Sequence, residues 1–559
     1  MKFSEYPVRV MSTKKIIEKT DVFTEQIKNA QSAKELFLIL RKLDKFNDNL
    51  RSDISVINVK YTLNVNDQKI LKLLMKLDAE LPLTAESSKN CSLAILNSQF
   101  IEDIRAKFGN YWVNLLEIGI KLNDPCIVEE QIALNQISTQ YGGIIGTAEI
   151  EFRGEKYNLS QIGKFMQDPD RATRKEAAFA HAKWYENHSK ELGTIYDQMV
   201  KLRDKMAKKM GFRNFVDFAY LGLMRTDYNS HDVAKYRDQI REVCVPFASK
   251  LWAAQRKRIG VSHLYFYDNG YKFKDGNSVP NDNPEGILRK GRVMYNEMSP
   301  ETGTFFQTML DNDLIDVIAR PGKTPGGYMT SFPRYQVPFI FANFNGTQGD
   351  VEVVTHEVGH AFQYYTARKI KPGDFISPTL EACEIHSMSM EFLTWPWMHN
   401  FFDNVSKFKK SHLEDALTFI PYGALVDHFQ HYVYENPQVS HIDRMKKWRE
   451  LEREYLPHMD YEDCEFLERG GYWMRQKHIF ESPFYYIDYT LAQVVAFQFL
   501  IESHRDWNKA WKKYLRFCKM GGKYPFVTLL KKGGLRVPFD DDNIKKTFIP
   551  LKKILKDFA

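Results

Sequence analysis

The sequence predicts a mainly α-helical protein with a small β-sheet, and three observations lead to that class. Over most of the 559 residues, apolar side chains recur three or four positions apart, as on one face of a helix. Period-two alternation, which indicates a strand, is confined to short stretches. Hydrophobic residues make up 43% and aromatic residues 14% of the chain, which is enough for a sizeable core.

Residues 1–165 are predicted to form an N-terminal helical lobe, and residues 166–559 the region that holds the candidate functional residues. Within the lobe, residues 33–41 and 67–75 show apolar and charged positions at helical spacing. The chain has no internal repeat and no low-complexity linker. A flexible tether between the two regions is therefore not expected.

Two elements are expected where the regions meet. Residues 147–157 alternate with period two around Gly154, which predicts a small hairpin. Helical spacing then returns, and residues 170–210 are expected to hold two long helices that end at Gly211.

A strand that leads into a helix is predicted near the middle of the chain. Residues 337–344 are apolar and aromatic and indicate a short strand. A turn at residues 349–350, with Asp350 as N-cap, opens an amphipathic helix that runs to about residue 368. A second helix is expected to open near Ser377 and Pro378, since proline suits the first helical position. The strand predicted at residues 337–344 would suit a sheet edge along which an extended peptide could lie.

The first of these helices contains His356-Glu357-Val358-Gly359-His360, an H-E-x-x-H pattern. His356 and His360, four positions apart, stand on the same helix face and can bind one zinc ion. Glu357 lies about 100° round the helix, where it is poorly placed to bind the metal but can reach a water on it. The pattern indicates two metal ligands and a general base.

A zinc site with catalytic function usually has three protein ligands, so a third must come from elsewhere. The second helix offers Glu381, Glu384, His386 and Glu391. Spacing alone does not choose between Glu381 and Glu384, which are three positions apart. His386 points about 200° away from Glu384 and is expected to serve elsewhere.

Two further carboxylates are candidates for orienting the ligand imidazoles. Glu352 lies four residues before His356, on the same row of the helix. Glu391 lies two turns after Glu384 on the second helix. Either could accept the second N–H of a ligand histidine, the alternative being an ordinary salt bridge or solvated charge.

The segment Pro325-Gly326-Gly327-Tyr328 is a candidate substrate contact. Two glycines let a backbone approach another group closely, and Tyr328 could touch a substrate. The alternative is an ordinary turn with a packing tyrosine.

Together these residues resemble one family. His356 to His360, followed by Glu384 and Glu391, is similar to the thimet oligopeptidase and oligoendopeptidase F family of zinc peptidases. Residues 325–328, 339–346 and 482–489 resemble its bacterial oligoendopeptidase branch, which includes the Pz-peptidases. The likeness spans about residues 165 to 550.

The resemblance implies a mostly helical peptidase fold with a small sheet beside a deep substrate channel. It selects Glu384 as the third ligand, with one zinc ion per chain and with residues 166–559 as the catalytic region. It also implies that the substrates are short unstructured peptides, cut at internal bonds by water that Glu357 deprotonates. Folded proteins would not enter such a channel.

The resemblance also assigns roles near the C-terminus. Residues 473–499 by themselves suggest an aromatic helix. In the family, a histidine followed by tyrosines in this region contacts substrate or stabilises the transition state. His478 fits the histidine, and Tyr485 and Tyr489 fit the tyrosines, although Tyr486 could replace one of them. A hydrogen-bond donor aimed at the developing oxyanion is worth about 3–4 kcal/mol.

Composition excludes several other classes. The net charge of +7 is spread along the chain without a basic block, which argues against nucleic-acid binding. No apolar stretch is long enough for a membrane span or a signal peptide. Six cysteines without paired spacing indicate reduced thiols, so a cytoplasmic location is expected. The sequence does not give the oligomeric state.

Two rival functions are retained. A related zinc carboxypeptidase would need a cation for the substrate carboxylate, and Arg334 or Arg475 could serve. A peptide-binding protein without activity is the other, and the presence of Glu357 argues against it.

Overall fold

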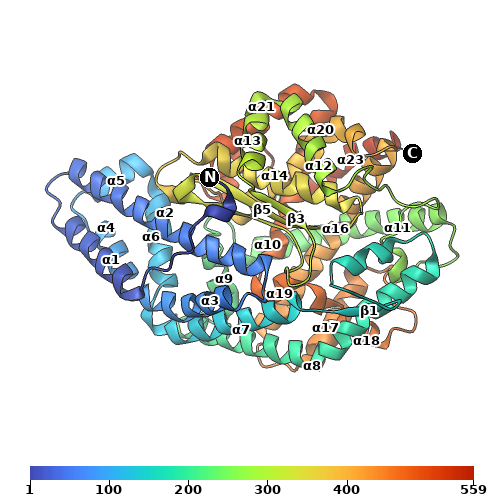
Figure 1. Ribbon diagram of the computed structural model, residues 1–559, viewed down its shortest axis with the longest axis horizontal. Helices are drawn as coiled ribbons and strands as arrows, with labels where there is room; N and C mark the ends of the chain where they lie inside the picture. The colour runs from blue at the N-terminus through green and yellow to red at the C-terminus, as the bar shows by residue number, and fades with distance from the viewer. Residues whose placement is uncertain (559) are drawn as a thin grey trace.

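The computed structural model describes residues 1–558, and helices make up most of it (Figure 1). Two small sheets complete the fold among these residues. The predicted mainly α-helical class is confirmed. The largest hydrophobic core runs from Phe3 to Ile554 and joins helices from both ends of the chain.

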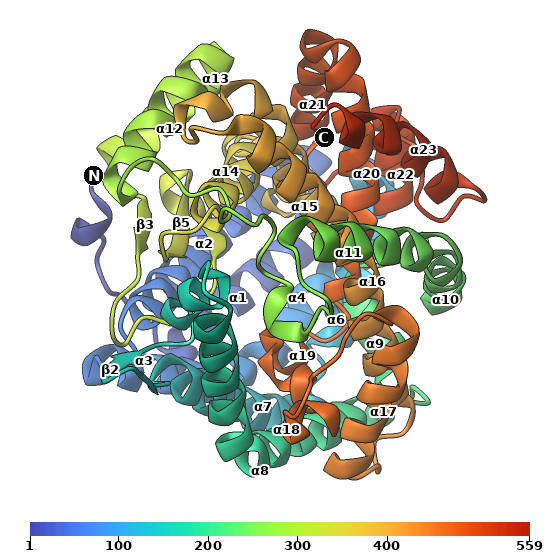
Figure 2. The same cartoon turned by 90° about the vertical axis from the view of Figure 1, so that its right-hand side faces the viewer.

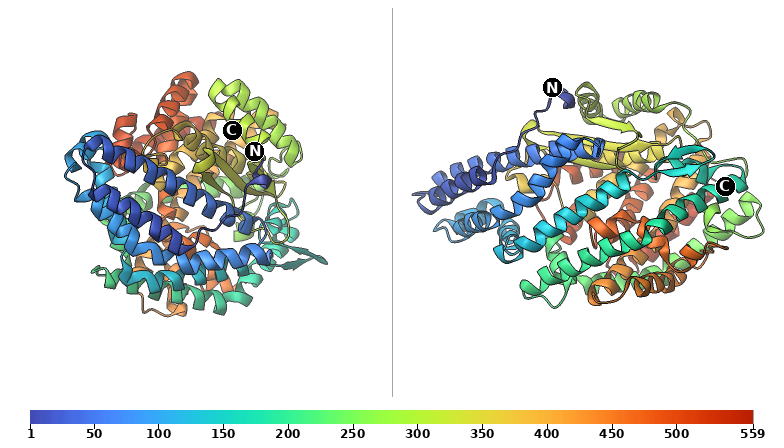
Figure 3. Two further views of the ribbon diagram at one scale, coloured as in Figure 1. Left: turned by 60° about the vertical axis from the view of Figure 1, so that its left-hand side comes forward. Right: turned by 60° about the horizontal axis from the view of Figure 1, so that its bottom comes forward.

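The N-terminal helices form the blue end of the molecule in Figures 1 and 3. Several begin at a polar side chain that accepts a backbone N–H: Ser12 for α1, Ser32 for α2 and Asp67 for α3. A separate core cluster around Trp112 holds part of this lobe together. The helices are α1 (Thr13–Lys28), α2 (Ala33–Leu63), α3 (Gln68–Glu80), α4 (Ala85–Leu96), α5 (Ile101–Phe108), α6 (Asn110–Leu122) and α7 (Val128–Gly146).

The connection to the rest of the chain is a hairpin and one long helix. Strands β1 (Ile150–Phe152) and β2 (Glu155–Tyr157) pair antiparallel, so the predicted hairpin is confirmed. The prediction of two helices over residues 170–210 is wrong, because α8 (Arg171–Lys209) is a single helix of 39 residues. No proline interrupts it, and Gly193 lies where a Cβ would come within 2.7 Å of His441. That glycine serves helix packing and does not break the helix.

The second sheet has the strand order β3-β5-β4. Strand β5 (Val337–Phe344) occupies the centre, parallel to β3 (Ile315–Ile318) and antiparallel to β4 (Tyr328–Phe332). The predicted strand over residues 337–344 is confirmed, but the expectation that it offers a sheet edge to a peptide is wrong, because β3 and β4 flank it on both sides. Most of its side chains are buried, as expected for a central strand flanked on both sides.

Helix α14 (Gly349–Ala367) follows β5 directly, as predicted. The role expected for Asp350 is wrong in detail, because Gln348 is the N-cap residue. The Asp350 carboxylate instead accepts the backbone N–H groups of Asn345 and Gly346, both at 2.9 Å. It therefore fixes the loop between β5 and α14.

Helix α15 (Leu380–Leu393) packs against α14, and α20 (Tyr486–Arg505) packs against α15 (Figure 2). The predicted start, with Ser377 as the cap, is two residues early, since Thr379 is the N-cap. Gly359 of α14 faces α15 at very short range. A Cβ on it would stand 2.5 Å from the Ser387 Cα and 2.6 Å from the His386 carbonyl oxygen. Only a hydrogen fits in that space.

The remaining helices complete the large C-terminal region. They are α9 (Phe215–Gly222), α10 (Ser230–Gln239), α11 (Val245–Ile259), α12 (Pro284–Met298), α13 (Pro300–Asp311), α16 (Val405–Glu435), α17 (His441–Tyr455), α18 (Glu465–Glu468), α19 (Lys477–Glu481), α21 (Trp507–Met520), α22 (Phe526–Gly533) and α23 (Asn543–Lys556). The boundary at residue 165 stays a prediction, since Phe3, Val56 and Tyr141 of the N-terminal lobe also belong to the largest core.

We expect Gly359→Ala to lower the thermal midpoint of unfolding. The added methyl group must push α15 away from α14, and overpacking of this kind costs about 1–3 kcal/mol. Gly119→Ala is the matched control, because Gly119 lies inside α6 and a Cβ there meets nothing within 4 Å. Scanning calorimetry on both variants tests this. Equal midpoints for the two variants would refute the proposed packing constraint.

Candidate active site

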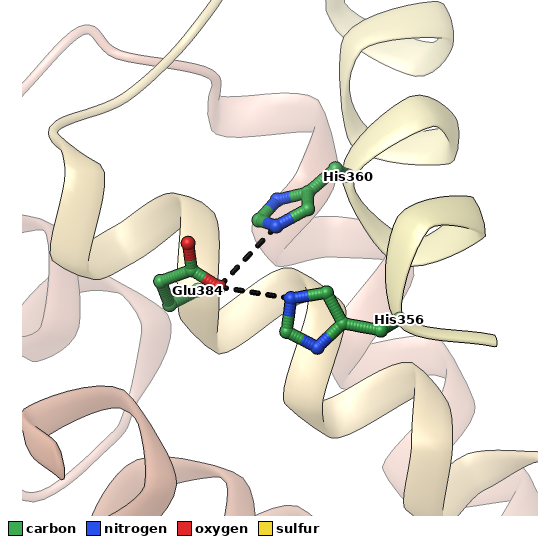
Figure 4. Close-up of side chains that lie close together, drawn as sticks. All are labelled: His356, His360 and Glu384. Atoms are coloured by element: carbon green, nitrogen blue, oxygen red, sulfur yellow. Dashed lines mark ion pairs between the residues drawn. The ribbon is translucent and has the colours of Figure 1, made fainter. Parts of the chain in front are cut away.

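Two helices bring three potential metal ligands together (Figure 4). His356 and His360 project from α14, and Glu384 projects toward them from α15. The Glu384 Oε2 atom lies 3.2 Å from His356 Nε2 and 3.3 Å from His360 Nε2. One ligand atom from each residue lies within 4.8 Å of the other two.

This geometry suits a tetrahedral zinc ion. With bonds of ~2.0–2.1 Å, neighbouring ligand atoms in such a site stand ~3.3 Å apart. The two distances from Glu384 to the histidines match that separation. Two imidazoles and one carboxylate are also a donor set that zinc enzymes use with a fourth position left for water.

Glu391 holds the first histidine in place. Its Oε1 atom lies 2.7 Å from His356 Nδ1, and its Oε2 atom lies 2.7 Å from His412 Nε2. The Trp395 indole N–H donates to His412 Nδ1 at 2.9 Å, which places the His412 proton on Nε2. In this series of hydrogen bonds the Glu391 carboxylate accepts the N–H of His356 Nδ1, so that His356 Nε2 points at the metal position.

Glu352 takes a different partner. Its Oε1 atom accepts a hydrogen bond from the Gln348 side chain at 2.9 Å, and no bond to a histidine is seen among residues 1–558. Burial raises the pKa of Glu352 to about 7. Of the two carboxylates proposed to orient a ligand imidazole, the structure brings Glu391 into contact with His356 and turns Glu352 toward the start of α14.

Glu357 lies beside the three ligands and is almost fully buried. Burial raises its pKa, and the charges of His356 and His360 oppose that rise. Its Oε2 atom is buried without a hydrogen-bond partner among residues 1–558. A buried carboxylate oxygen with no partner is ready to accept a proton from a water in the site.

Gly327 makes room for Glu357. A Cβ on Gly327 would stand 3.3 Å from Glu357 Oε1 and 3.4 Å from the Phe341 carbonyl oxygen. Gly326 has φ +96°, a conformation that disfavours other residues. Gly327 thus lets the loop before β4 pass close to the general-base candidate.

Tyr328 connects the sheet to the N-terminal lobe. Its hydroxyl lies 2.5 Å from Thr62 Oγ1 of α2, and its ring stacks on Phe341 at 4.7 Å between centroids. The side chain keeps partial exposure to solvent. A direct contact with substrate stays a prediction for Gly326, Gly327 and Tyr328.

The candidate residues near the C-terminus lie on two helices that a short turn separates. The aromatic helix suggested for residues 473–499 is divided into a 3₁₀ turn, α19 and α20. Phe484, with φ +65°, lies in the break between α19 and α20. This turn allows His478 Nε2 of α19 to lie 3.1 Å from the Tyr489 hydroxyl of α20.

Gln476 fixes the His478 tautomer. The Gln476 amide N–H donates to His478 Nδ1 at 2.7 Å, and the Tyr422 hydroxyl donates to the Gln476 carbonyl oxygen at 2.9 Å. The single proton of the neutral imidazole is therefore on Nε2, facing Tyr489. Burial lowers the pKa of His478 to about 4, so the ring is neutral near pH 7.

The tyrosines of α20 reach the ligand carboxylate. The Tyr485 hydroxyl donates a hydrogen bond to Glu384 Oε1, the oxygen that does not face the histidines. The Tyr485 and Tyr489 rings lie 4.9 Å apart. Tyr486 lies 5.1 Å from the His478 ring and has no hydrogen bond to a ligand among residues 1–558. Burial raises the pKa of Tyr485 and of Tyr489 well above the usual value of a phenol, so both remain donors.

The other candidates raised by the sequence lie outside this cluster. Glu381 is fully buried and accepts a hydrogen bond from the Tyr228 hydroxyl at 2.7 Å. His386 Nδ1 lies 3.4 Å from Cys518 Sγ, and burial lowers its pKa to about 3. The choice of Glu384 over Glu381 thus agrees with the positions of both side chains.

Sequence reasoning missed His412, Trp395 and Gln476. His412 and Trp395 act by a hydrogen bond to a residue on another element, whereas Gln476, the N-cap of α19, acts on His478 of the same helix. The position of Gln476 two residues before His478 is the one signal that the sequence contained.

Family models match most of the chain. The model described as peptidase family M3 matches residues 164–281 and 295–547, and the model of the peptidase M3 N-terminal domain matches residues 3–123. The chain belongs to peptidase family M3. No curated protein matches it.

Solved structures of M3 peptidases are similar over the whole chain. A structure described as Pz peptidase A with an inhibitor is 40% identical, with a TM-score of 0.98 over 100% of this chain and 99% of its own. A structure provisionally named oligoendopeptidase F, from Bacillus anthracis, is 38% identical, with a TM-score of 0.93 over 100% and 98%. The protein is thus a peptidase with the fold of these enzymes, as the resemblance implied.

None of the helices among residues 1–558 combines the length and the apolar content that crossing a bilayer requires.

The M3 N-terminal model ends at residue 123, and the main M3 model begins at residue 164.

We expect Glu391→Gln to weaken zinc binding by about 10- to 100-fold. The amide removes the negative charge that His356 Nδ1 and His412 Nε2 share, and loss of such a supporting carboxylate has effects of this size. Glu352→Gln is the control, since Glu352 bonds to Gln348 on its own helix. Competition with a zinc chelator measures both dissociation constants. A similar loss in the control would mean that the contact with His356 is not what matters.

Proposed function

We propose that this M3 peptidase is a zinc-dependent oligoendopeptidase that hydrolyses internal bonds of short unstructured peptides. The observation that carries the proposal is the spacing of the ligand atoms of His356, His360 and Glu384 beside the unpartnered carboxylate of Glu357. Further support comes from similarity to oligoendopeptidase and Pz-peptidase structures over the full length.

His356, His360 and Glu384 would hold the zinc ion. Bound zinc supplies Lewis acidity, which lowers the pKa of a coordinated water toward ~7 and polarises the scissile carbonyl. Glu391 sets the orientation of His356, and Tyr485 sets that of Glu384. The ligands therefore keep their geometry without rearrangement when a substrate arrives.

Glu357 acts as general base and then as general acid. Its free Oε2 atom accepts a proton from the attacking water and later gives it to the leaving amine. Its buried surroundings raise its pKa, which makes the carboxylate a stronger base than one in water. The water adds to the carbonyl carbon, and the peptide C–N bond breaks as the amine takes the proton.

Neutral donors stabilise the oxyanion. His478 Nε2 carries its proton toward the Tyr489 hydroxyl, and this pair lies next to Tyr485 and the zinc ligands. Tyr485 already donates to Glu384, so Tyr489 is the tyrosine free to turn its proton toward the substrate. The Tyr486 ring lies 5.1 Å from the His478 ring and is suited to contact with a substrate side chain.

A zinc carboxypeptidase remains the second candidate. Arg334 is unavailable for that role, because Asp53 and Asn49 of α2 occupy its guanidinium. Arg475 makes no ion pair among residues 1–558, which is the observation that keeps this candidate. Product mapping on a peptide with both ends blocked separates an endopeptidase, which cuts it, from a carboxypeptidase, which does not.

We expect Glu357→Gln to keep about one zinc ion per chain and to lose the cleavage of an internally quenched, doubly blocked peptide. The amide retains the shape of the side chain but cannot accept the proton, so the cleavage rate should fall by about 10²-fold or more. Chelator-treated wild type is the second arm, and zinc content is measured on each sample. If wild type holds zinc and leaves the peptide intact, the endopeptidase proposal fails. If Glu357→Gln cuts at the wild-type rate, the assigned base is wrong.

We expect Tyr489→Phe to lower kcat by about 10²- to 10³-fold with unchanged zinc affinity, because it removes a donor to the oxyanion. Tyr485→Phe is the matched variant. It should weaken zinc binding as well, since it frees the Glu384 carboxylate. Rates under saturating peptide and chelator competition give the two quantities. The reverse pattern, with zinc loss in Tyr489→Phe alone, would exchange the roles of the tyrosines.

A further inference from the structure

Arg475 is a solvent-exposed guanidinium without a carboxylate partner among residues 1–558. It ends the 3₁₀ turn Gly471–Arg475, directly before α19. Its one hydrogen bond to protein runs from Nη1 to the Tyr472 hydroxyl, at 2.8 Å. Arg449, in contrast, pairs with both Glu452 and Glu468. A planar group with five donors and one partner is able to bind an anion.

The guanidinium lies among aromatic side chains from several elements. Its centre is 4.6 Å from the Tyr472 ring, and Tyr422 of α16, Tyr185 of α8 and Tyr486 of α20 are close enough to raise its pKa. The Tyr422, Tyr472 and Tyr486 side chains are all partly exposed to solvent. Arg475 thus lies near tyrosines from α8, α16 and α20, and its side chain remains exposed to solvent.

Aromatic rings connect Arg475 to the proposed oxyanion donors. The His478 and Tyr486 rings lie 5.1 Å apart, Tyr486 and Tyr422 5.8 Å, and Tyr422 and Tyr472 6.3 Å. These ring-to-ring distances limit the separation between His478 and Arg475 to the length of about six residues of extended peptide, at ~3.3 Å per residue. Aromatic faces can contact many kinds of side chain, so these rings are expected to discriminate little between peptide sequences.

We propose that Arg475 binds the C-terminal carboxylate of the peptide substrate and thereby favours short peptides. This inference rests on the proposed oligoendopeptidase function and adds to it a length-selecting contact. A guanidinium matches a carboxylate in a bidentate pair, and every short peptide has one carboxylate at its end. Glu452, an acidic side chain whose charge acts on both Tyr422 and Tyr472, already binds Trp448, Arg449 and Tyr461. It does not compete for Arg475.

The test compares three N-blocked, internally quenched peptides that differ at the C-terminus. One ends in a free acid, one in an amide, and one in an amide with aspartate as the last residue. For wild type, we expect kcat/KM to be about 10- to 100-fold higher for the free acid than for the amide, as a charge-assisted hydrogen-bonded pair predicts. The difference should lie mainly in KM, because the contact exists before and during the reaction.

In Arg475→Gln, the ratio between acid and amide should fall to about one, and Arg475→Lys should keep part of it. Lys477→Gln is the matched control, since it removes a positive charge two residues away that pairs with Glu481. It should leave the ratio at the wild-type value. Zinc content and the thermal midpoint verify that each variant is folded. Extension of the peptide by about ten residues beyond the scissile bond should abolish the preference for the acid.

The outcomes separate this inference from the proposed function. If wild type cuts acid and amide equally well, the function stands and the role of Arg475 is overturned. The same holds if the preference survives in Arg475→Gln. If the aspartyl amide is cut as well as the free acid, the site reads any carboxylate and the C-terminal assignment is overturned. If wild type holds zinc and cuts none of the peptides, the endopeptidase function fails, and this inference fails with it.

Discussion

The close contact between α14 and α15 at Gly359 determines whether the site can exist. Helix α14 holds His356, Glu357 and His360, while α15 holds Glu384. These side chains are too short to meet unless the two backbones approach closely, and Gly359 permits that approach because a Cβ would collide with the Ser387 backbone. The contact is one of packing, so the metal position depends on a small residue that binds nothing.

A layer of buried polar groups then fixes each functional side chain. Glu391 and His412 orient His356, and Gln476 orients His478. In the low dielectric of the interior these hydrogen bonds are strong, and each member has a defined donor or acceptor role. The donors and acceptors of the site are therefore set before any peptide binds, which is what electrostatic stabilisation of a transition state requires.

The small sheet has a connecting role. Tyr328 at its edge bonds to Thr62, and Arg334 in the turn after β4 pairs with Asp53, both on α2. Gly327, directly before Tyr328, passes close to Glu357. The sheet thus joins the N-terminal lobe to the general-base candidate. The aromatic side chains near Arg475, among them Tyr422, Tyr472 and Tyr486, come instead from the C-terminal part of the chain.

The sequence by itself determined the features that depend on local spacing. Helical periodicity gave the mainly α class, the four-residue spacing gave His356 and His360, and alternation gave the hairpin and β5. Where a pattern was continuous, it did not show whether a helix was interrupted. Residues 170–210 proved to form one helix, and the break before α20 depends on a positive φ at Phe484.

Only the tertiary structure decided which distant residues meet. Glu381 and Glu384 are equivalent by spacing, and the crossing of α15 over α14 places Glu384 at the histidines while Glu381 reaches Tyr228. Arg334 and Arg475 are equivalent as cations, and a carboxylate on α2 occupies Arg334 alone. Such differences arise from contacts between elements far apart in the chain, about which periodicity and motif spacing carry no information.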